Sequence, residues 1–377
     1  MKKFYLLTVL VMFPQIVETM YSPALSTIAL AFEVPAQVAA QTLSVYFVAF
    51  AVGVFFWGRA ADLYGRRPSL LGGLLCYALA SFIALVTHDF TVLLIARIIS
   101  AFGAAVGSVV VQTILRDKYQ GDELIKVFSL IGVVLAISPA IGMLSGGLLN
   151  QHWGYQGVFI ALFLFAITLF IFSAKNIEET KPIKIQTASF ITTTARMLKD
   201  RQLWLATGLI AIFNISAFSY YTVAPFIFER LDASGTLFGY TGMMMAFGSI
   251  CGSQTNKIAL SRGISNQILF LCALILLLIS SVTVYLLSDS LWFVVPMMFI
   301  MMSYAMAIPI ILGVVLNHYQ DCRGTAGAVL GLAYYLLIAI GLGISGWLQN
   351  LGLVQISLSC MALLLAQIYL KKIKLTA

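Results

Sequence analysis

The sequence predicts an all-α membrane protein with twelve transmembrane helices, arranged as two parallel six-helix repeats. Of the 377 residues, 61% are hydrophobic and only 10% are charged, whereas about a quarter of the residues in a soluble domain are charged. Residues 127–174 and 324–370 contain no Asp, Glu, Lys or Arg at all. These uncharged runs exclude a soluble enzyme, and they differ from the strands of about ten alternating residues that build a membrane barrel.

Twelve apolar segments, each near the roughly 20 residues that cross a bilayer, follow one another between charged residues or Gly, Pro and Asn. The first segment continues for 28 residues, about twice the length of a signal-peptide core, so we expect a retained helix. The predicted segments are 4–31, 38–57, 70–86, 90–115, 126–149, 156–174, 202–228, 236–258, 267–287, 291–316, 325–348 and 351–370.

The basic residues predict that both termini lie in the cytoplasm. If the N-terminus is inside, 20 of the 22 Lys and Arg residues fall on inside segments, as the positive-inside rule requires. Of the other two, Arg97 lies within a segment and Arg230 on an outside loop. The net charge of +8 is therefore interpreted as a topology signal with some contact to membrane lipid, and nucleic acid is not an expected partner.

A charged, polar linker divides the chain into two halves. The expected boundaries are an N-terminal six-helix bundle at 1–174, a cytoplasmic linker at 175–201 and a C-terminal six-helix bundle at 202–377. Short repeats about 200 positions apart, such as Tyr-Gln at 119–120 and again at 319–320, indicate that the halves are equivalent. Transporters with this organisation bind substrate at the interface between their repeats.

The most specific motif, GRAADLYGRRP, begins at Gly58 on the inside loop between the second and third segments. Gly65 permits a tight reversal, the arginines keep the loop inside, and Asp62 can pair with them or cap a helix. A purely topogenic loop would explain the arginines but not the spacing of Gly and Asp. The motif resembles the G-x-x-x-D-x-x-G-R-[KR] signature of the major facilitator superfamily. That resemblance implies a cytoplasmic gate, locked by charge contacts between the halves, at Gly58, Asp62, Gly65, Arg66 and Arg67.

Two further motifs resemble those of the twelve-helix drug:proton antiporters in that superfamily. The run from Arg97 to Ala105 is similar to R-x-x-Q-[GA]-x-G-A-A, with Ser100 in place of Gln. Ser138, Pro139 and Gly142 are similar to the helix-5 antiporter motif G-P-x-x-G, with serine for the first glycine. A proline-kinked helix packed through small residues is the alternative interpretation of the second motif.

Within that group, the sequences MYSPAL at 20–25, APF at 224–226 and RGTAGA at 323–328 resemble the bicyclomycin-resistance (Bcr/CflA) branch over nearly the whole chain. In that branch an Asp precedes the Met-Tyr pair, where this chain has Thr19 and, one position earlier, Glu18. The resemblance therefore implies that Glu18 carries the proton site.

Glu18 and Arg97 are the predicted proton-coupling residues on physical grounds as well. Each is the sole residue of its charge deep within a predicted segment, and intramembrane ionisable residues are functional candidates by default. We expect the two side chains to approach directly or through one polar bridge. The alternative is a structural ion pair with no part in transport.

The predicted substrate cavity takes residues from both halves. Gln15, Glu18 and Ser22 form one polar stripe at helical spacing, and the seventh segment supplies polar and aromatic groups. A methionine-rich wall would suit varied lipophilic substrates, although ordinary packing is the alternative for the methionines. The expected cavity residues are Gln15, Thr19, Ser22, Asn214, Tyr221, Thr222, Met298 and Met301.

The predicted function is proton-coupled efflux (antiport) of small amphipathic or drug-like molecules across a bacterial inner membrane by alternating access, performed by a monomer. Export of a dedicated metabolite, such as a siderophore or amino acid, is the alternative. A membrane-embedded enzyme or receptor would need paired carboxylates, a His cluster or a Ser/Lys dyad within the segments, and the sequence has none. It also lacks a GxxxxGK[ST] loop and metal-type Cys spacing, so no cofactor or metal is expected.

Overall fold

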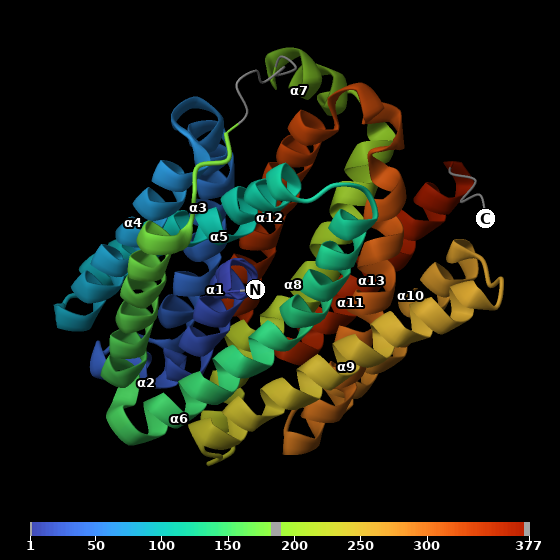
Figure 1. The fold of residues 1–377 in the computed structure, drawn as a ribbon. Coiled ribbons are helices and arrows are strands. Elements are labelled where there is room, and N and C mark those ends of the chain that lie inside the picture. The colour runs from blue at the N-terminus through green and yellow to red at the C-terminus, as the bar shows by residue number, and fades with distance from the viewer. Residues whose placement is uncertain (1, 182–189, 373–377) are drawn as a thin grey trace. The chain divides into compact units, whose positions relative to one another are not determined.

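A computed structural model describes residues 2–181 and 190–372, and the described residues form helices without any strand. The helices are drawn in Figure 1. Their bounds are α1 (Lys2–Tyr21), η1 (Ser22–Ala24), α2 (Leu25–Ala31), α3 (Ala36–Tyr64), α4 (Arg66–Val86), α5 (Phe90–Lys118), α6 (Gly121–Asn176), α7 (Phe190–Leu198), α8 (Arg201–Arg230), α9 (Gly235–Ser261), α10 (Asn266–Leu286), η2 (Leu291–Phe293), α11 (Val294–Val315), η3 (Asn317–Cys322), α12 (Arg323–Leu348) and α13 (Leu351–Lys372).

The helices match the twelve predicted segments. In the described part of the chain, ten helical stretches are long and apolar enough to cross a membrane. One of them, Lys126–Asn176, contains two predicted segments, because Gly154 has non-helical angles (φ 63°, ψ −167°) that divide α6. The eighth predicted segment is the 27-residue helix α9. The prediction of an all-helical, multi-pass membrane protein is therefore confirmed.

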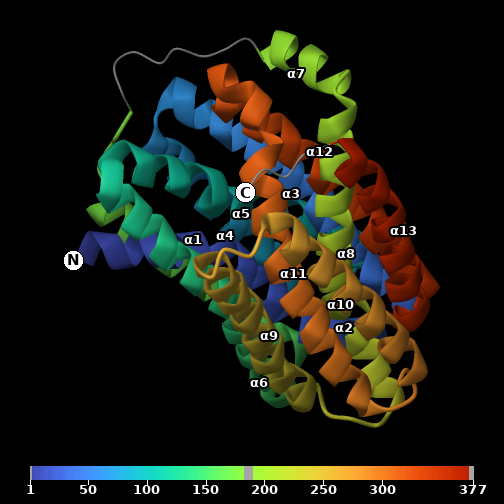
Figure 2. The ribbon, with the colours of Figure 1, turned by 90° about the vertical axis from the view of Figure 1, so that its right-hand side faces the viewer.

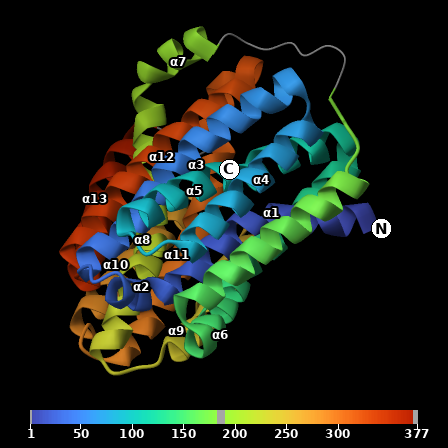
Figure 3. The ribbon, with the colours of Figure 1, turned by 90° about the vertical axis from the view of Figure 1, so that its left-hand side faces the viewer.

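The chain forms two compact units, of which unit 1 is Met1–Gln186 with Ser234–Gly242, and unit 2 is Thr187–Ala233 with Met243–Ala377. In unit 1, α1 packs against α5 and α6, and α4 packs against both of these helices (Figure 3). Glycines permit the close approaches: a Cβ on Gly107 of α5 would lie 2.5 Å from the Leu10 carbonyl oxygen, and one on Gly142 of α6 would lie 2.5 Å from that of Ile16. Gly142 therefore has a packing role, which is the alternative interpretation of the helix-5 motif.

In unit 2, α8 packs against α11, α12 and α13, and α10 packs against α11 and α13 (Figure 2). On α9, Gly248 and Gly252 face the main-chain oxygens of Met298 and Met302 on α11. Unit 1 contains the equivalent contact, because a Cβ on Gly53 of α3 would lie 2.6 Å from the carbonyl oxygen of Phe102 on α5. The same glycine-to-backbone approach at matching helices supports the predicted internal repeat.

The predicted linker at 175–201 contains a short helix, and its residues 182–189 lie outside the described part of the chain. On the unit 2 side, Arg196 of α7 donates from Nη2 to the His318 carbonyl at 2.6 Å, and its guanidinium lies 4.7 Å from the ring centroid of Tyr319. The Tyr319 hydroxyl in turn donates to Asp200 at 2.9 Å. These contacts anchor the end of the linker to the η3 segment within unit 2.

Candidate functional site

An acid and a base are buried within unit 1. Glu18 lies near the end of α1 and is 7% exposed, while Arg97 lies on α5 and is 1% exposed. The guanidinium carbon of Arg97 is 3.8 Å from the ring centroid of Tyr21 and 4.7 Å from that of Tyr46. Such cation–π contacts stabilise a desolvated cation by about 2 kcal/mol or more. The Tyr21 ring is itself held, because its hydroxyl donates to Thr42 of α3 at 3.0 Å.

The expected direct pair between Glu18 and Arg97 is not formed. Among the described residues, no ion pair within 4.0 Å joins them, although the Arg97 charge acts electrostatically on Glu18. Glu18 and Tyr21 are three positions apart and therefore share a face of α1. Arg97 of α5 therefore contacts α1 through the aromatic ring of Tyr21. The coupling of the two charges stays a prediction.

Thr19 and Glu18 face different neighbours, because one residue turns a helix by about 100°. Thr19 is 1% exposed, and its hydroxyl donates to the Gln15 carbonyl at 2.7 Å. A Cβ on Gly142 of α6 would overlap the Thr19 hydroxyl oxygen. We therefore assign Thr19 to the contact between α1 and α6 and do not carry it into the proposed cavity. Ser22 is buried in η1, and Gln15 has a buried side-chain oxygen without a hydrogen-bond partner.

The other predicted cavity residues belong to unit 2, where most of them are buried. The Asn214 amide donates to the Ile210 carbonyl at 2.8 Å, and the Thr222 hydroxyl donates to the Phe218 carbonyl at 3.2 Å. Both side chains therefore form hydrogen bonds to the backbone of their own helix, α8. Tyr221 is 2% exposed and Met301 is 6% exposed. Met298 packs its backbone against Gly248 of α9, which favours the packing interpretation for this methionine.

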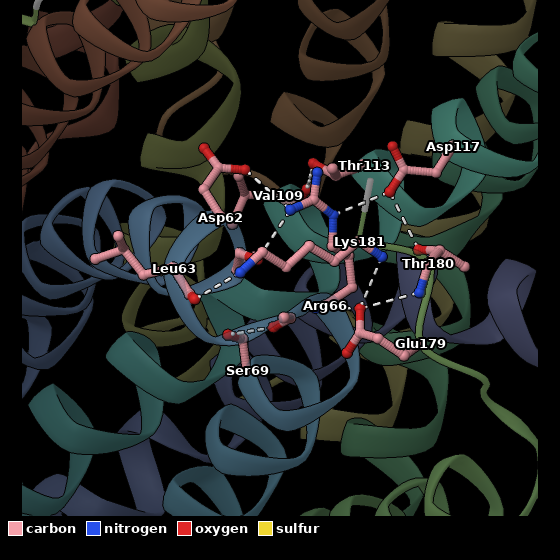
Figure 4. A network of polar contacts seen from close by, with 12 residues as sticks. Asp62, Leu63, Arg66, Ser69, Val109, Thr113, Asp117, Glu179, Thr180 and Lys181 are labelled. Carbon is pink, nitrogen blue, oxygen red and sulfur yellow. Dashed lines mark hydrogen bonds and ion pairs between the residues drawn. The ribbon is translucent and has the colours of Figure 1, made fainter. Parts of the chain in front are cut away.

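The GRAADLYGRRP motif, predicted as a loop, spans the end of α3, the turn at Gly65 and the start of α4. It is part of a charge cluster, shown in Figure 4, in which Arg66 is buried and the acidic groups are partly exposed or exposed. The Arg66 side chain, 4% exposed, donates to Asp62 at 3.0 Å and to Asp117 of α5 at 2.9 Å. Gly65 precedes α4 with φ 111° and ψ 159°, a conformation that side-chain-bearing residues rarely adopt. That turn brings Arg66 back beside Asp62.

A carboxylate from beyond α6 binds the same turn. Glu179 accepts hydrogen bonds from the backbone N–H groups of Arg66 at 2.8 Å, Arg67 at 3.2 Å, and Thr180 and Lys181 at 2.9 Å each. Arg66 and Arg67 are the first residues of α4, and the start of a helix presents unpaired N–H groups that attract anions. Glu179 therefore caps α4 from a segment 113 positions away.

Side-chain contacts complete this arrangement. The Thr180 hydroxyl donates to Asp117 at 3.1 Å, and Lys181 Nζ donates to the Leu63 carbonyl at 2.7 Å. Arg67 donates to the Ala174 carbonyl at 2.7 Å. We name Asp62, Arg66, Asp117 and Glu179 the clamp. Sequence reasoning assigned Asp62 and Arg66 but missed Asp117 and Glu179. Asp117 is an acidic residue at the end of a helix and Glu179 is one in a polar linker, and neither position is distinctive in the sequence.

The clamp should persist at neutral pH and open only in acid. Partial burial raises the pKa of Glu179, but its four backbone donors outweigh burial and hold that pKa below its usual range. A lowered pKa stabilises the folded state above the unfolded pKa, about 4.3, and the stabilisation is lost as the pH falls through the folded value. The difference in unfolding midpoint between wild type and Glu179→Gln should therefore stay constant from neutral pH to about that value and shrink below it. A difference that vanishes well above the ordinary pKa of Glu would contradict this assignment.

Asp62 is expected to affect switching and not substrate affinity. Asp62→Asn weakens its pair with Arg66, and a partly exposed ion pair contributes about 1 kcal/mol or less, which corresponds to a change of about fivefold or less in transport rate. Initial rates in proteoliposomes and equilibrium binding to purified protein measure the two effects separately. A tenfold fall in affinity, about 1.4 kcal/mol, would show that Asp62 acts on the binding site.

The fold is that of a multi-pass membrane protein. The chain belongs to the Major Facilitator Superfamily, whose sequence profile matches residues 7–342. It is 31% identical over 340 residues to an uncharacterized transporter of Rickettsia bellii (strain RML369-C), covering 86% of this chain and 84% of that protein. It is 28% identical over 342 residues to the chloramphenicol resistance protein of Pseudomonas aeruginosa, covering 87% and 79%. It is 25% identical over 342 residues to the multidrug resistance protein MdtL of Shigella flexneri, covering 85% and 84%.

Solved structures agree on the fold. The chain superposes on a D-xylose-proton symporter with a TM-score of 0.75 and 14% identity, covering 99% of each chain. The predicted family is therefore confirmed, and the resistance proteins among its relatives agree with the drug:proton antiporter group. Members of this family are transporters and not enzymes.

Proposed function

We propose that this protein is a proton-coupled efflux antiporter of small amphipathic or drug-like molecules in a bacterial inner membrane, acting as a monomer with both termini in the cytoplasm. The observation that carries the proposal is the burial of Glu18 on α1 together with Arg97 on α5. An acid kept at this depth is costly, and proton transfer gives it a function. The named resistance proteins among the relatives support export of drug-like molecules.

In this proposal Glu18 takes up a proton from outside and releases it inside, and the proton gradient drives export. Moving one charge across 100 mV supplies about 2.3 kcal/mol. The clamp joins the turn between α3 and α4 to α5 and to the segment after α6. We assign it the role of a brace that lets these helices of unit 1 move together during alternating access, with Gly58, Gly65 and Arg67 shaping the same turn.

Substrate contact is assigned separately in each unit. In unit 1 the candidates are Gln15 and Ser22, on the same stripe as Glu18. In unit 2 they are Asn214, Tyr221, Thr222 and Met301, whose polar and aromatic groups lie on α8 and α11. The helix-5 residues Ser138, Pro139 and Gly142 are assigned to the packing of α6 on α1.

The test is transport by purified protein in proteoliposomes with an imposed proton gradient. Substrate movement and proton flux are recorded for cationic, neutral and anionic drugs, amino acids and a siderophore. Gradient-dependent export of several drugs, each with coupled proton flux, is the expected result. Export of a single metabolite class would favour the dedicated exporter, and substrate movement without proton flux would overturn antiport.

A further inference from the structure

Four buried polar atoms around Arg97 have no hydrogen-bond partner among the residues that the structure describes. They are Arg97 Nε and Nη2 and the hydroxyl oxygens of Tyr46 and Tyr77. Arg97 and Tyr46 are each 1% exposed, and Tyr77 is fully buried. An unmet buried polar group costs about 1–3 kcal/mol, and more when it is charged. Most buried polar side chains in proteins are paired, so this group of unmet atoms requires an explanation.

The unmet groups belong to neighbouring side chains on three helices. Tyr46 of α3 lies under the Arg97 guanidinium, as described above. The Tyr77 hydroxyl of α4 lies beside Arg97 and Ser81 but meets hydrogen-bond geometry with neither, and Tyr77 also interacts electrostatically with Tyr46. Both nitrogens of Arg97 are donors, and each phenol has a proton to donate. The partner that suits this set is therefore an acceptor of hydrogen bonds, and the charge of Arg97 favours an anionic one.

The charge balance at Arg97 depends on Glu18. The titratable groups that face Arg97 from the helices around it are Glu18 and Tyr21 on α1, Tyr46 on α3 and Tyr77 on α4. Glu18 is the one carboxylate among these groups, and it makes no ion pair with Arg97 in the described structure. Protonation of Glu18 leaves the guanidinium without a counter-charge, and a lone buried ion costs several kcal/mol.

We infer that Arg97, Tyr46 and Tyr77 form a binding site for a small monovalent anion, which is occupied when Glu18 holds its proton. The inference deepens the proposed function and relies on its assignment of Glu18 as the proton site. The anion is a free halide or a small free carboxylate and not the exported molecule, whose binding releases the proton under antiport. Either anion accepts these hydrogen bonds. Proton and anion then bind together, because each removes the unfavourable charge that the other would leave.

The test measures the unfolding midpoint of the purified full chain in detergent against chloride, bromide or acetate. Gluconate at equal ionic strength is the reference, because its six-carbon chain is too bulky for a site that accepts chloride or acetate. A ligand of the native state raises the midpoint in a saturable way. Chloride is expected to do so, with an affinity at least about tenfold tighter at acid than at alkaline pH. Glu18→Gln, which mimics the protonated acid, should bind equally tightly at both. Acetate in place of chloride would identify a carboxylate site.

The tyrosines supply matched variants that keep the rings and the packing. Tyr46→Phe and Tyr77→Phe should each weaken chloride binding severalfold, and Arg97→Gln should abolish it. Tyr21→Phe should leave it unchanged, because the Tyr21 hydroxyl already donates to Thr42. No difference between chloride, acetate and gluconate at any pH, or equal responses from Tyr46→Phe and Tyr21→Phe, would overturn the anion site. Proton release by wild type tests the role of Glu18 independently, so the two proposals can fail separately.

Discussion

Glu18→Gln is expected to abolish substrate-induced proton release while the protein remains folded. The amide has nearly the shape of the acid but cannot take up or release a proton. Glu18 is 7% exposed, and α1 contains no other carboxylate that could replace it. Substrate is added to purified protein in weak buffer with a pH indicator, and released protons are counted against bound substrate. The variant should still unfold in one cooperative transition, at a lower midpoint than wild type because Arg97 loses its counter-charge.

Glu229→Gln is the control for this experiment, since Glu229 is exposed at the end of α8. It should release protons as wild type does. Unchanged proton release from folded Glu18→Gln would remove Glu18 from the coupling mechanism. The burial of Glu18 near Arg97 would then be structural, and the fold and the family assignment would stand.

Gly65→Ala is expected to have the second large effect, a loss of most transport activity. A side chain at φ 111° is strained, at a cost of about 1–3 kcal/mol. The added Cβ would also overlap the carboxylate of Glu179, which must then leave the backbone N–H groups that it caps. Initial export rates in proteoliposomes should fall by at least about tenfold, the equivalent of 1.4 kcal/mol, with the unfolding midpoint lowered.

Gly132→Ala on α6 is the matched control, because a Cβ there meets no atom within 4 Å. This variant should transport at the wild-type rate. If Gly65→Ala also transports normally, the capping of α4 by Glu179 is not part of the transport cycle. A Gly65→Ala protein that fails to transport but retains the wild-type unfolding midpoint would place the effect in switching alone.

Much of the fold could be predicted because its signals are local. Twenty apolar residues in succession must satisfy their backbone groups internally once they are in lipid, so each long segment forms a helix whatever its neighbours. The same reasoning singled out Glu18 and Arg97, since a charge within such a segment is costly wherever the helix packs. The Gly-Asp-Gly-Arg spacing likewise marked the turn at Gly65 before its partners were known.

The partners of these residues were decided by tertiary structure. Asp117 and Glu179 reach Arg66 from 51 and 113 positions away, and neither has a distinctive sequence pattern. Arg97 lies over Tyr21 and not in an ion pair with Glu18, and Thr19 meets α6 because Gly142 leaves space there. Helix length and depth follow from the burial preferences of each segment. The pairing of side chains depends on helix rotation and separation, which are set by close packing between segments distant in the sequence.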